Sequence, residues 1–343
     1  MRPVLVLVEG AERDGGASAA GGADGAVRAS AFRLLTLARR LGDPVAVVCH
    51  PVAAYGVDAL ARFGAARICV AEPADPDGKD TAAQSAVALE ALTELAWQMD
   101  ASAVLVPSGR LGREVAARLA VRLGGGIVTG AVDVRPGPDG PVAVQEVCGG
   151  TYRVESAVRG GTPVIAVDTG AGEAEPDPVD PVVERMFVSV AESSRRVRRL
   201  ARRPKADRRP GVAGASVVVA GGRGVGSAEG FTLIEKVADA LGGAVGGTHT
   251  AADRGWCPQD ALIGQTGAVV HPRLYLACGI SGSVHHRAGM HHAATIVAID
   301  TDPDAPIFRI ADVGVVGDLH DVLPALLAAI ARQRAAERGG PTP

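Results

Sequence analysis

The chain has 343 residues and a formal charge of −3, a length that predicts about two domains. This charge excludes the global basic field of a typical nucleic-acid-binding protein, so a small molecule or another protein is the expected partner. Its five scattered cysteines contain no C-x-x-C pair, which predicts reduced thiols. No apolar run approaches the ~18 residues of a membrane span, so we expect a soluble, cytoplasmic protein without membrane insertion.

Short β-branched runs alternate with helix-like segments through the first half of the chain, a pattern typical of βαβ units. We expect strands at 4–8, 45–49, 67–70 and 103–107, and helices at 28–41, 57–63, 81–99 and 110–123. Glycine and proline turns then separate four strand-like pieces, 127–134, 142–147, 152–158 and 163–168, which predict an antiparallel appendage. The first predicted domain, an α/β domain, covers residues 1–192.

Arginine and lysine dominate residues 193–211. A patch for an anionic partner is one interpretation, but a solvated interdomain linker is favoured. Beyond it, residues 212–343 predict a second domain, a doubly wound parallel sheet. Its expected strands are 215–220 and 274–278, with a short piece at 244–247 and further strand-like pieces at 295–299, 307–313 and 315–316. Its expected helices are 231–241, one from about 283, and 319–332.

A glycine loop, GGRGVGS, follows the first strand of this second domain. It departs from the dinucleotide fingerprint G-x-G-x-x-G, because Ser227 holds the third glycine position, and it lacks the Lys-Ser/Thr of a P-loop. A structural turn and a ligand loop are therefore both open. Arg223 favours the ligand loop, since a guanidinium at the carboxyl end of a parallel strand suits an anionic cofactor.

A second loop of small residues, Gly279 to Ser283, follows strand 274–278. Backbone N–H groups at the start of the next helix would suit a pyrophosphate. The competing interpretation is a hydrolase nucleophile elbow, G-x-S-x-G, with Ser281 as nucleophile. Ser283 stands where that motif requires glycine, so no catalytic residue is assigned.

Four histidines, His285, His286, His291 and His292, raise the question of a metal site. Adjacent residues on a helix diverge by about 100°, and no H-E-x-x-H is present, so a metal is not predicted. A histidine in the first helical turn would instead donate to negative charge on a bound ring. His291 and His292 are expected to be exposed.

The second domain resembles the alpha subunits of electron transfer flavoproteins. The resemblance is carried by GGRG, by GQTG from Gly264, by LACGISG from Leu276, by DPDAPIF from Asp302, and by Gly317-Asp318-Leu319, in the family's order. These motifs cover most of residues 215–330. In the first domain the similarity is looser, resting on VLVEG and GREVAARLAVRL.

The resemblance implies an FAD that lies extended across the second domain. Arg223 would lie near the flavin ring, Thr266 would bond flavin N5, and His286 would reach the pyrimidine C2 carbonyl and stabilise an anionic semiquinone. The residues that match the family's FAD contacts are Arg223, Thr248, His249, Ile263, Gly264, Gln265, Thr266, Ser281, Gly282, Ser283, Val284, His285, His286, Asp300, Asp318 and Leu319.

Two positions depart from the family pattern. His249 replaces a usual arginine, which would make the flavin potential pH-dependent because histidine is only partly charged near neutrality. Asp300 replaces a common asparagine and adds a negative charge beside the adenosine half.

The family's function is that of an electron carrier without its own substrate chemistry. The implied partners are a beta subunit, flavin dehydrogenases such as the acyl-CoA dehydrogenases of fatty acid oxidation, and a membrane quinone oxidoreductase as acceptor, with no nucleic acid. A nicotinamide-dependent oxidoreductase that uses the glycine loop, and an electron-bifurcating complex with a second FAD, are the alternatives.

Overall fold

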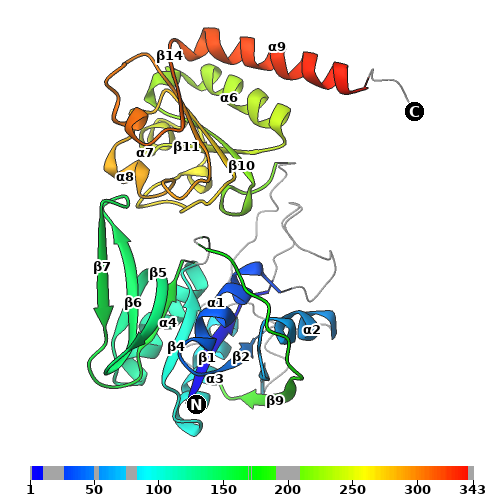
Figure 1. Cartoon of the computed structure of the whole chain (residues 1–343), viewed down its shortest axis with the longest axis vertical. Coiled ribbons are helices and arrows are strands. Elements are labelled where there is room, and N and C mark those ends of the chain that lie inside the picture. Colours follow the sequence, from blue (N-terminus) through cyan, green and yellow to red (C-terminus); the bar gives the residue numbers. More distant parts are fainter. Residues whose placement is uncertain are drawn as a thin grey trace. The chain divides into compact units, whose positions relative to one another are not determined.

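The computed structural model describes residues 2–10, 27–49, 54–74, 83–168, 170, 172–190 and 209–338. The chain divides into two compact units, each of which layers helices on a sheet (Figure 1). Most of the predicted basic linker, up to residue 208, lies outside the described residues and stays a prediction. No described helix combines the length and the apolar character that crossing a bilayer requires.

A nine-stranded sheet forms the centre of the first unit, in the order β7-β6-β5-β8-β4-β1-β2-β3-β9. Strands β1, β2, β3, β4, β8 and β9 run parallel to their neighbours. The strand bounds are β1 (Pro3–Val8), β2 (Asp43–Val48), β3 (Arg67–Pro73), β4 (Ala103–Pro107), β5 (Ile127–Gly137), β6 (Gly140–Val147), β7 (Tyr152–Ala157), β8 (Val164–Val167) and β9 (Val182–Val188).

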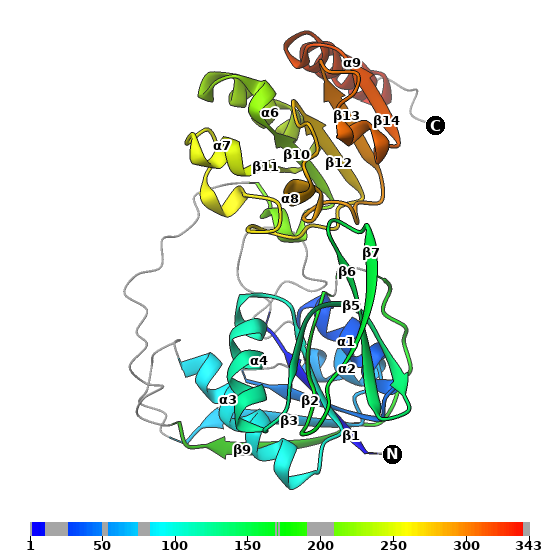
Figure 2. The same cartoon turned by 90° about the vertical axis from the view of Figure 1, so that its left-hand side faces the viewer.

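Helices cover both faces of this sheet. Helices α1 (Ala29–Arg39) and α2 (Ala54–Arg62) pack on one face with Val4, Val6 and Val8 of β1. Helices α3 (Ala83–Gln98) and α4 (Arg110–Arg122) lie side by side on the other face, over Leu5 and Leu7 (Figure 2). Because both faces are buried, the central strands are continuously apolar, which is why they were predictable as strands.

The predicted antiparallel appendage is only partly correct. Strands β5 and β6 pair antiparallel, as expected. Strand β8, however, pairs parallel with β4 on one side and β5 on the other, so its assignment to the appendage is wrong. The chain crosses back from β7 through a turn at Gly160 and Gly161, both with positive φ, before it enters the sheet.

The second unit has a five-stranded parallel sheet, in the order β11-β10-β12-β13-β14. Numbered from its first strand, this is the doubly wound order 2-1-3-4-5, which confirms the predicted fold class. The strands are β10 (Val217–Gly221), β11 (Ala244–Gly247), β12 (Leu274–Cys278), β13 (Ile296–Asp300) and β14 (Val313–Val316).

Two helices lie side by side on one face of this second sheet, α6 (Ala228–Leu241) and α9 (Leu319–Arg338) (Figure 1). Short helices α7 (His249–Asp253) and α8 (Val284–Arg287) follow β11 and β12. Of the strand expected at 307–313, only Val313 lies in a strand, as the first residue of β14. Pro306–Arg309 instead form a 3₁₀ turn, η4, that buries Ile307.

Candidate functional site

The centre of the second sheet has the topology of a ligand-binding crevice. Strand β11 lies on one side of β10, whereas β13 lies on the opposite side of β12. The strand order therefore reverses between β10 and β12, which are neighbours in the sheet. In open parallel sheets, ligands bind at such a point, beyond the carboxyl ends of the strands. Here those ends carry the two glycine loops, after Gly221 and after Cys278.

The two loops pack backbone against backbone. The amides of Gly222 and Gly224 donate to the carbonyls of Cys278 and Gly279, each over 3.0 Å. A Cβ at Gly222 would lie 2.3 Å from the Gly279 carbonyl oxygen, and Gly279 has φ +60°. Glycine is therefore required for the loops themselves, whatever they bind.

Ser227 explains why the dinucleotide fingerprint is imperfect. Its side chain caps α6 by accepting a hydrogen bond of 3.0 Å from the Gly230 amide. A serine at the cap stabilises the helix start by about 1 kcal/mol. The third glycine of the fingerprint is thus replaced by a residue with a structural role.

The carboxyl ends of β10 and β12 offer positive groups to an anion. Arg223 is exposed at the carboxyl end of β10, and no carboxylate of the described residues forms an ion pair with it. Among the described residues, no backbone carbonyl accepts a hydrogen bond from the amides of Ser281, Gly282 and Ser283. Gly282 is held with φ +83° against Ile307 of η4, where a Cβ would come within 2.7 Å of its backbone. These groups fit a pyrophosphate.

The loop Ile263–Thr266 is tied to α8. The Gln265 amide donates to the His285 carbonyl over 2.8 Å, and His285 Nδ1 lies 2.7 Å from Gln265 Oε1. Gly264 packs directly under the same helix, with φ +145°. The Thr266 side chain is exposed at the end of this loop, so its hydroxyl is accessible to a ligand.

His286 is buried, with 4% of its surface exposed. Its Nδ1 lies 3.1 Å from the Ile263 carbonyl oxygen and its Nε2 lies 2.9 Å from the Tyr275 hydroxyl. Burial lowers its pKa to about 4, against which the bond to Ile263 acts weakly. Both ring nitrogens thus have protein partners, and reaching a flavin carbonyl would require one of these bonds to be exchanged.

Thr248 and His249 begin α7 at the carboxyl end of β11. Thr248 caps the helix, accepting from the Ala251 amide over 3.3 Å. His249 is 64% exposed and its Nδ1 lies 2.7 Å from Asp253 Oδ2, one turn along the helix. His249 therefore has a carboxylate partner on its own helix.

The residues expected beside adenosine lie at the ends of β13 and β14. Asp300 Oδ1 accepts from the Asp302 amide over 3.1 Å. The exposed Asp318 accepts from the amide and ring of His320, which lowers its pKa. Leu319 is buried in the core of the second unit. Its side chain also lies against Gly279, so it supports the loop of the candidate site.

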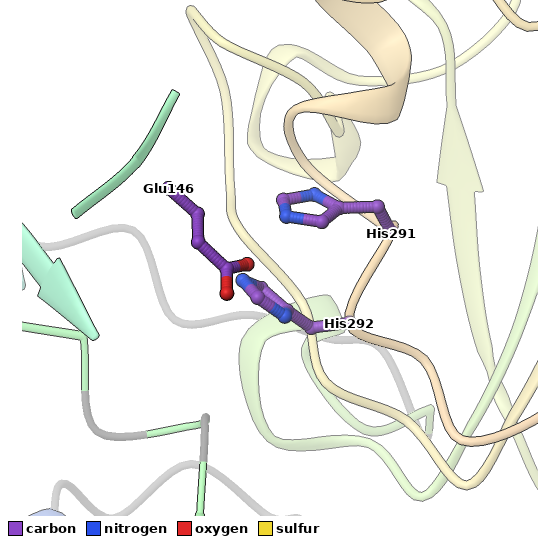
Figure 3. A group of neighbouring side chains, drawn as sticks. All are labelled: Glu146, His291 and His292. Carbon is purple, nitrogen blue, oxygen red and sulfur yellow. The ribbon is translucent and has the colours of Figure 1, made fainter. Parts of the chain in front are cut away.

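The four histidines do not converge. His285 bonds to Gln265, and His286 bonds to Ile263 and Tyr275. His291 and His292 instead lie beside each other, with ring centroids 3.9 Å apart and ring planes inclined by 38° (Figure 3). His292 also stacks on His271, at 5.2 Å. Both His291 and His292 are half-buried, so the expectation that they are exposed is wrong.

Sequence reasoning did not identify Tyr275 as part of this site. The signal was present, because a tyrosine in a buried strand requires a hydrogen-bond partner for its hydroxyl. Its partner is 11 residues further along the chain, and only the fold brings the two together.

The described residues of this doubly wound unit include close-packed glycine loops, amides that donate to no backbone carbonyl and an arginine at the switch point. This combination is typical of an α/β protein that binds a dinucleotide. Comparison with known families makes this more specific. Residues 211–291 match the electron transfer flavoprotein FAD-binding domain, and residues 17–191 match the electron transfer flavoprotein domain. The chain belongs to the electron transfer flavoprotein alpha subunit family, and FAD is its cofactor.

Similar proteins span nearly the whole chain. It is 43% identical to the electron transfer flavoprotein subunit alpha of Mycobacterium leprae over 330 residues, which cover 95% of this chain and 97% of the relative. It is 44% identical to that of Mycobacterium tuberculosis over 334 residues, covering 96% and 98%. The protein FixB of Clostridium saccharobutylicum is 33% identical over 313 residues, covering 89% and 92%.

Proposed function

We propose that this chain is the FAD-carrying half of a two-subunit electron carrier. It would pair with an electron transfer flavoprotein beta subunit and receive electrons from flavin dehydrogenases, such as acyl-CoA dehydrogenases. It would pass them to a quinone oxidoreductase at a membrane. Its family membership supports this role, since both mycobacterial relatives are named electron transfer flavoprotein subunit alpha.

One coincidence carries the proposal. The FAD-binding match, 211–291, contains β10, β11 and β12 together with the loops that follow them. These loops meet at the point where an open parallel sheet binds its ligand. A sequence relationship and a topological rule, which are independent, thus select the same crevice.

The chemistry of the crevice supports a carrier rather than an enzyme with its own substrate chemistry. Burial raises the pKa of Cys257 to about 11 and that of Cys278 further, so neither thiol is an accessible nucleophile at neutral pH. In the described residues, Ser281 has no hydrogen bond from its hydroxyl to a histidine. An activated serine requires such a base.

The site residues take their roles from this arrangement. The amides from Ser281 to Ser283 would bind the pyrophosphate, and Arg223 and Thr266 would lie at the isoalloxazine ring. His286, in the core beside the loop, would act at the pyrimidine end. Bound FAD supplies the one-electron chemistry, while these groups bind it, orient it and bias its potential through charge and hydrogen bonds.

The test is to co-express the chain with its beta subunit and to measure the FAD content and spectrum of the purified complex. We expect one FAD per complex, reduced by an acyl-CoA dehydrogenase with its substrate. Arg223→Gln should weaken FAD binding by roughly tenfold, as for loss of one charge-assisted contact. Arg273→Gln, at the amino end of β12, is the matched control. A colourless wild-type complex after reconstitution with FAD would reject the proposal.

The same preparation distinguishes the two alternatives. Two FAD molecules per complex would favour an electron-bifurcating role. Binding of NADH by this chain alone would favour a nicotinamide-dependent oxidoreductase, for which the cap at Ser227 is unfavourable, because it takes the position of the third fingerprint glycine.

A further inference from the structure

Tyr275 and His286 form a buried hydrogen-bonded pair beneath the loop Ile263–Thr266. The Tyr275 side chain on β12 has no exposed surface, and its hydroxyl lies 2.9 Å from His286 Nε2. The other ring nitrogen, Nδ1, lies 3.1 Å from the Ile263 carbonyl oxygen. The contacts therefore run without interruption from the central strand to the first residue of the loop.

The direction of both hydrogen bonds follows from the chemistry of the groups. A carbonyl oxygen only accepts, so Nδ1 must carry the proton that it donates to Ile263. In a neutral imidazole the other nitrogen then has only a lone pair, and it accepts the proton of the Tyr275 hydroxyl. The buried ring is neutral, since burial lowers its pKa to about 4.

The opposite tautomer would break the contact with the loop. If the proton moved to Nε2, the bare Nδ1 would face the Ile263 carbonyl oxygen, and two acceptors 3.1 Å apart repel each other. The acceptor-only Ile263 carbonyl thus selects the Nδ1–H tautomer. The Tyr275 hydroxyl, by donating to Nε2, holds the ring in the orientation that makes this contact.

We propose that Tyr275 is a positioning residue of the flavin site: by donating to Nε2, its hydroxyl fixes the orientation of the His286 ring, whose Nδ1–H holds the loop Ile263–Thr266 in place. The inference rests on the proposed function for its effect on FAD. The loop's other ties are backbone bonds, from the Ile263 amide to Gly247, from the Gly264 amide to Ala268 and from the Gln265 amide to His285. The His286 contact adds a side-chain bond that holds the Ile263 carbonyl, where the segment toward Thr266 begins.

The experiment has two readouts on the heterodimeric complex, each with Tyr275→Phe, which removes only the hydroxyl. The first is ¹⁵N NMR of labelled histidine side chains in the complex freed of FAD, with the His286 signals assigned through His286→Gln. The second is the midpoint potential of bound FAD. Tyr152→Phe removes the same hydroxyl from a ring that is 63% exposed and is the control.

We expect wild-type His286 to be neutral with its proton on Nδ1. Tyr275→Phe should keep that tautomer but shift the Nε2 resonance to that of a nitrogen whose lone pair accepts no hydrogen bond. A weakened loop should hold Thr266 less firmly and stabilise the added electron two- to tenfold less, lowering a one-electron potential by about 20–60 mV. The control should match wild type in both readouts.

Different results overturn the inference and the proposed function. A wild-type signal with the proton on Nε2, or an unchanged Nε2 resonance and potential in Tyr275→Phe, would overturn the positioning role. The wild-type signal decides the case even if the variant does not fold. Failure of the wild-type complex to bind FAD would overturn the proposed function while leaving the tautomer measurement intact.

Discussion

His286 makes the stability of the second unit depend on pH. Its folded pKa of about 4 lies below the value of about 6.5 for an unperturbed histidine because the ring is buried. Between these values the unfolded chain binds a proton that the folded chain does not. The contribution is therefore complete above pH 6.5 and is lost progressively as the pH falls toward 4.

The magnitude follows from the shift of 6.5 to about 4. At about 1.4 kcal/mol per unit, this shift corresponds to about 3 kcal/mol of folding free energy, most of it lost between pH 6.5 and 4.5. His286→Gln should abolish this loss, because glutamine does not titrate. The variant will be less stable than wild type at pH 7, since it loses the contacts of the ring, but the gap should close as the pH falls.

The assay is urea unfolding of the flavin-free chain at pH values from 7.5 to 4.5. Trp256 belongs to the core of the second unit and Trp97 is 66% exposed in the first. In a Trp97→Phe background, tryptophan fluorescence therefore reports the second unit. His249→Gln, at an exposed histidine, is the control and should parallel wild type. A free-energy gap between wild type and His286→Gln that stays constant over this range would refute the reasoning.

Three further outcomes are expected. In an unfolding assay, Gly279→Ala should destabilise the second unit by more than about 2 kcal/mol, because it adds a clash with the backbone to the strain of a positive φ. Gly226→Ala, with φ +84° and open space around it, should cost only about 1 kcal/mol. Glu90→Gln should cost the first unit about 1–2 kcal/mol, because it breaks a two-point ion pair with Arg122, and 1 M salt should reduce the difference. His249→Arg should flatten any pH dependence of the flavin midpoint potential; an unchanged profile would exclude His249 as its source.

The local pattern of the sequence was sufficient for elements that are buried on both faces. Strand β10 was expected at 215–220 and is found at Val217–Gly221, because an uninterrupted β-branched run that ends in glycine has few alternatives. The doubly wound class followed from the alternation of such runs with helices. The crevice followed in turn, since the loops after β10 and β12 must meet once the strands are parallel neighbours.

Pairing between distant segments was not predictable in the same way. The short glycine turn before β8 predicts a hairpin and hence an antiparallel appendage, but in the fold this strand inserts between β4 and β5. The apolar Ile307 predicts a strand, but it is buried in a 3₁₀ turn, where its amide donates to the Ser281 carbonyl. In both cases the partner lies far away in sequence, where local patterns carry no information.

The sequence predicts that His286 lies at the candidate site, but it does not predict the hydrogen bonds of the ring. The type of residue and its position after an anion-binding loop suggested a donor to a bound ring. The structure shows a ring whose partners, Tyr275 and Ile263, are 11 and 23 positions away. Burial and two fixed partners change what a histidine does, because they decide its charge and the location of its proton before any ligand is bound.

The two departures from the family pattern differ in their structural context. Asp300 uses Oδ1 to accept from the Asp302 amide over 3.1 Å, a bond that the carbonyl oxygen of an asparagine side chain would make equally well. The turn after β13 is therefore compatible with either residue, and the exchange changes charge alone. His249 instead lies 64% exposed on α7, paired with Asp253. Its exchange for arginine changes reach, hydrogen-bonding geometry and charge together, so of the two positions His249 is the one at which this chain should differ measurably from its relatives.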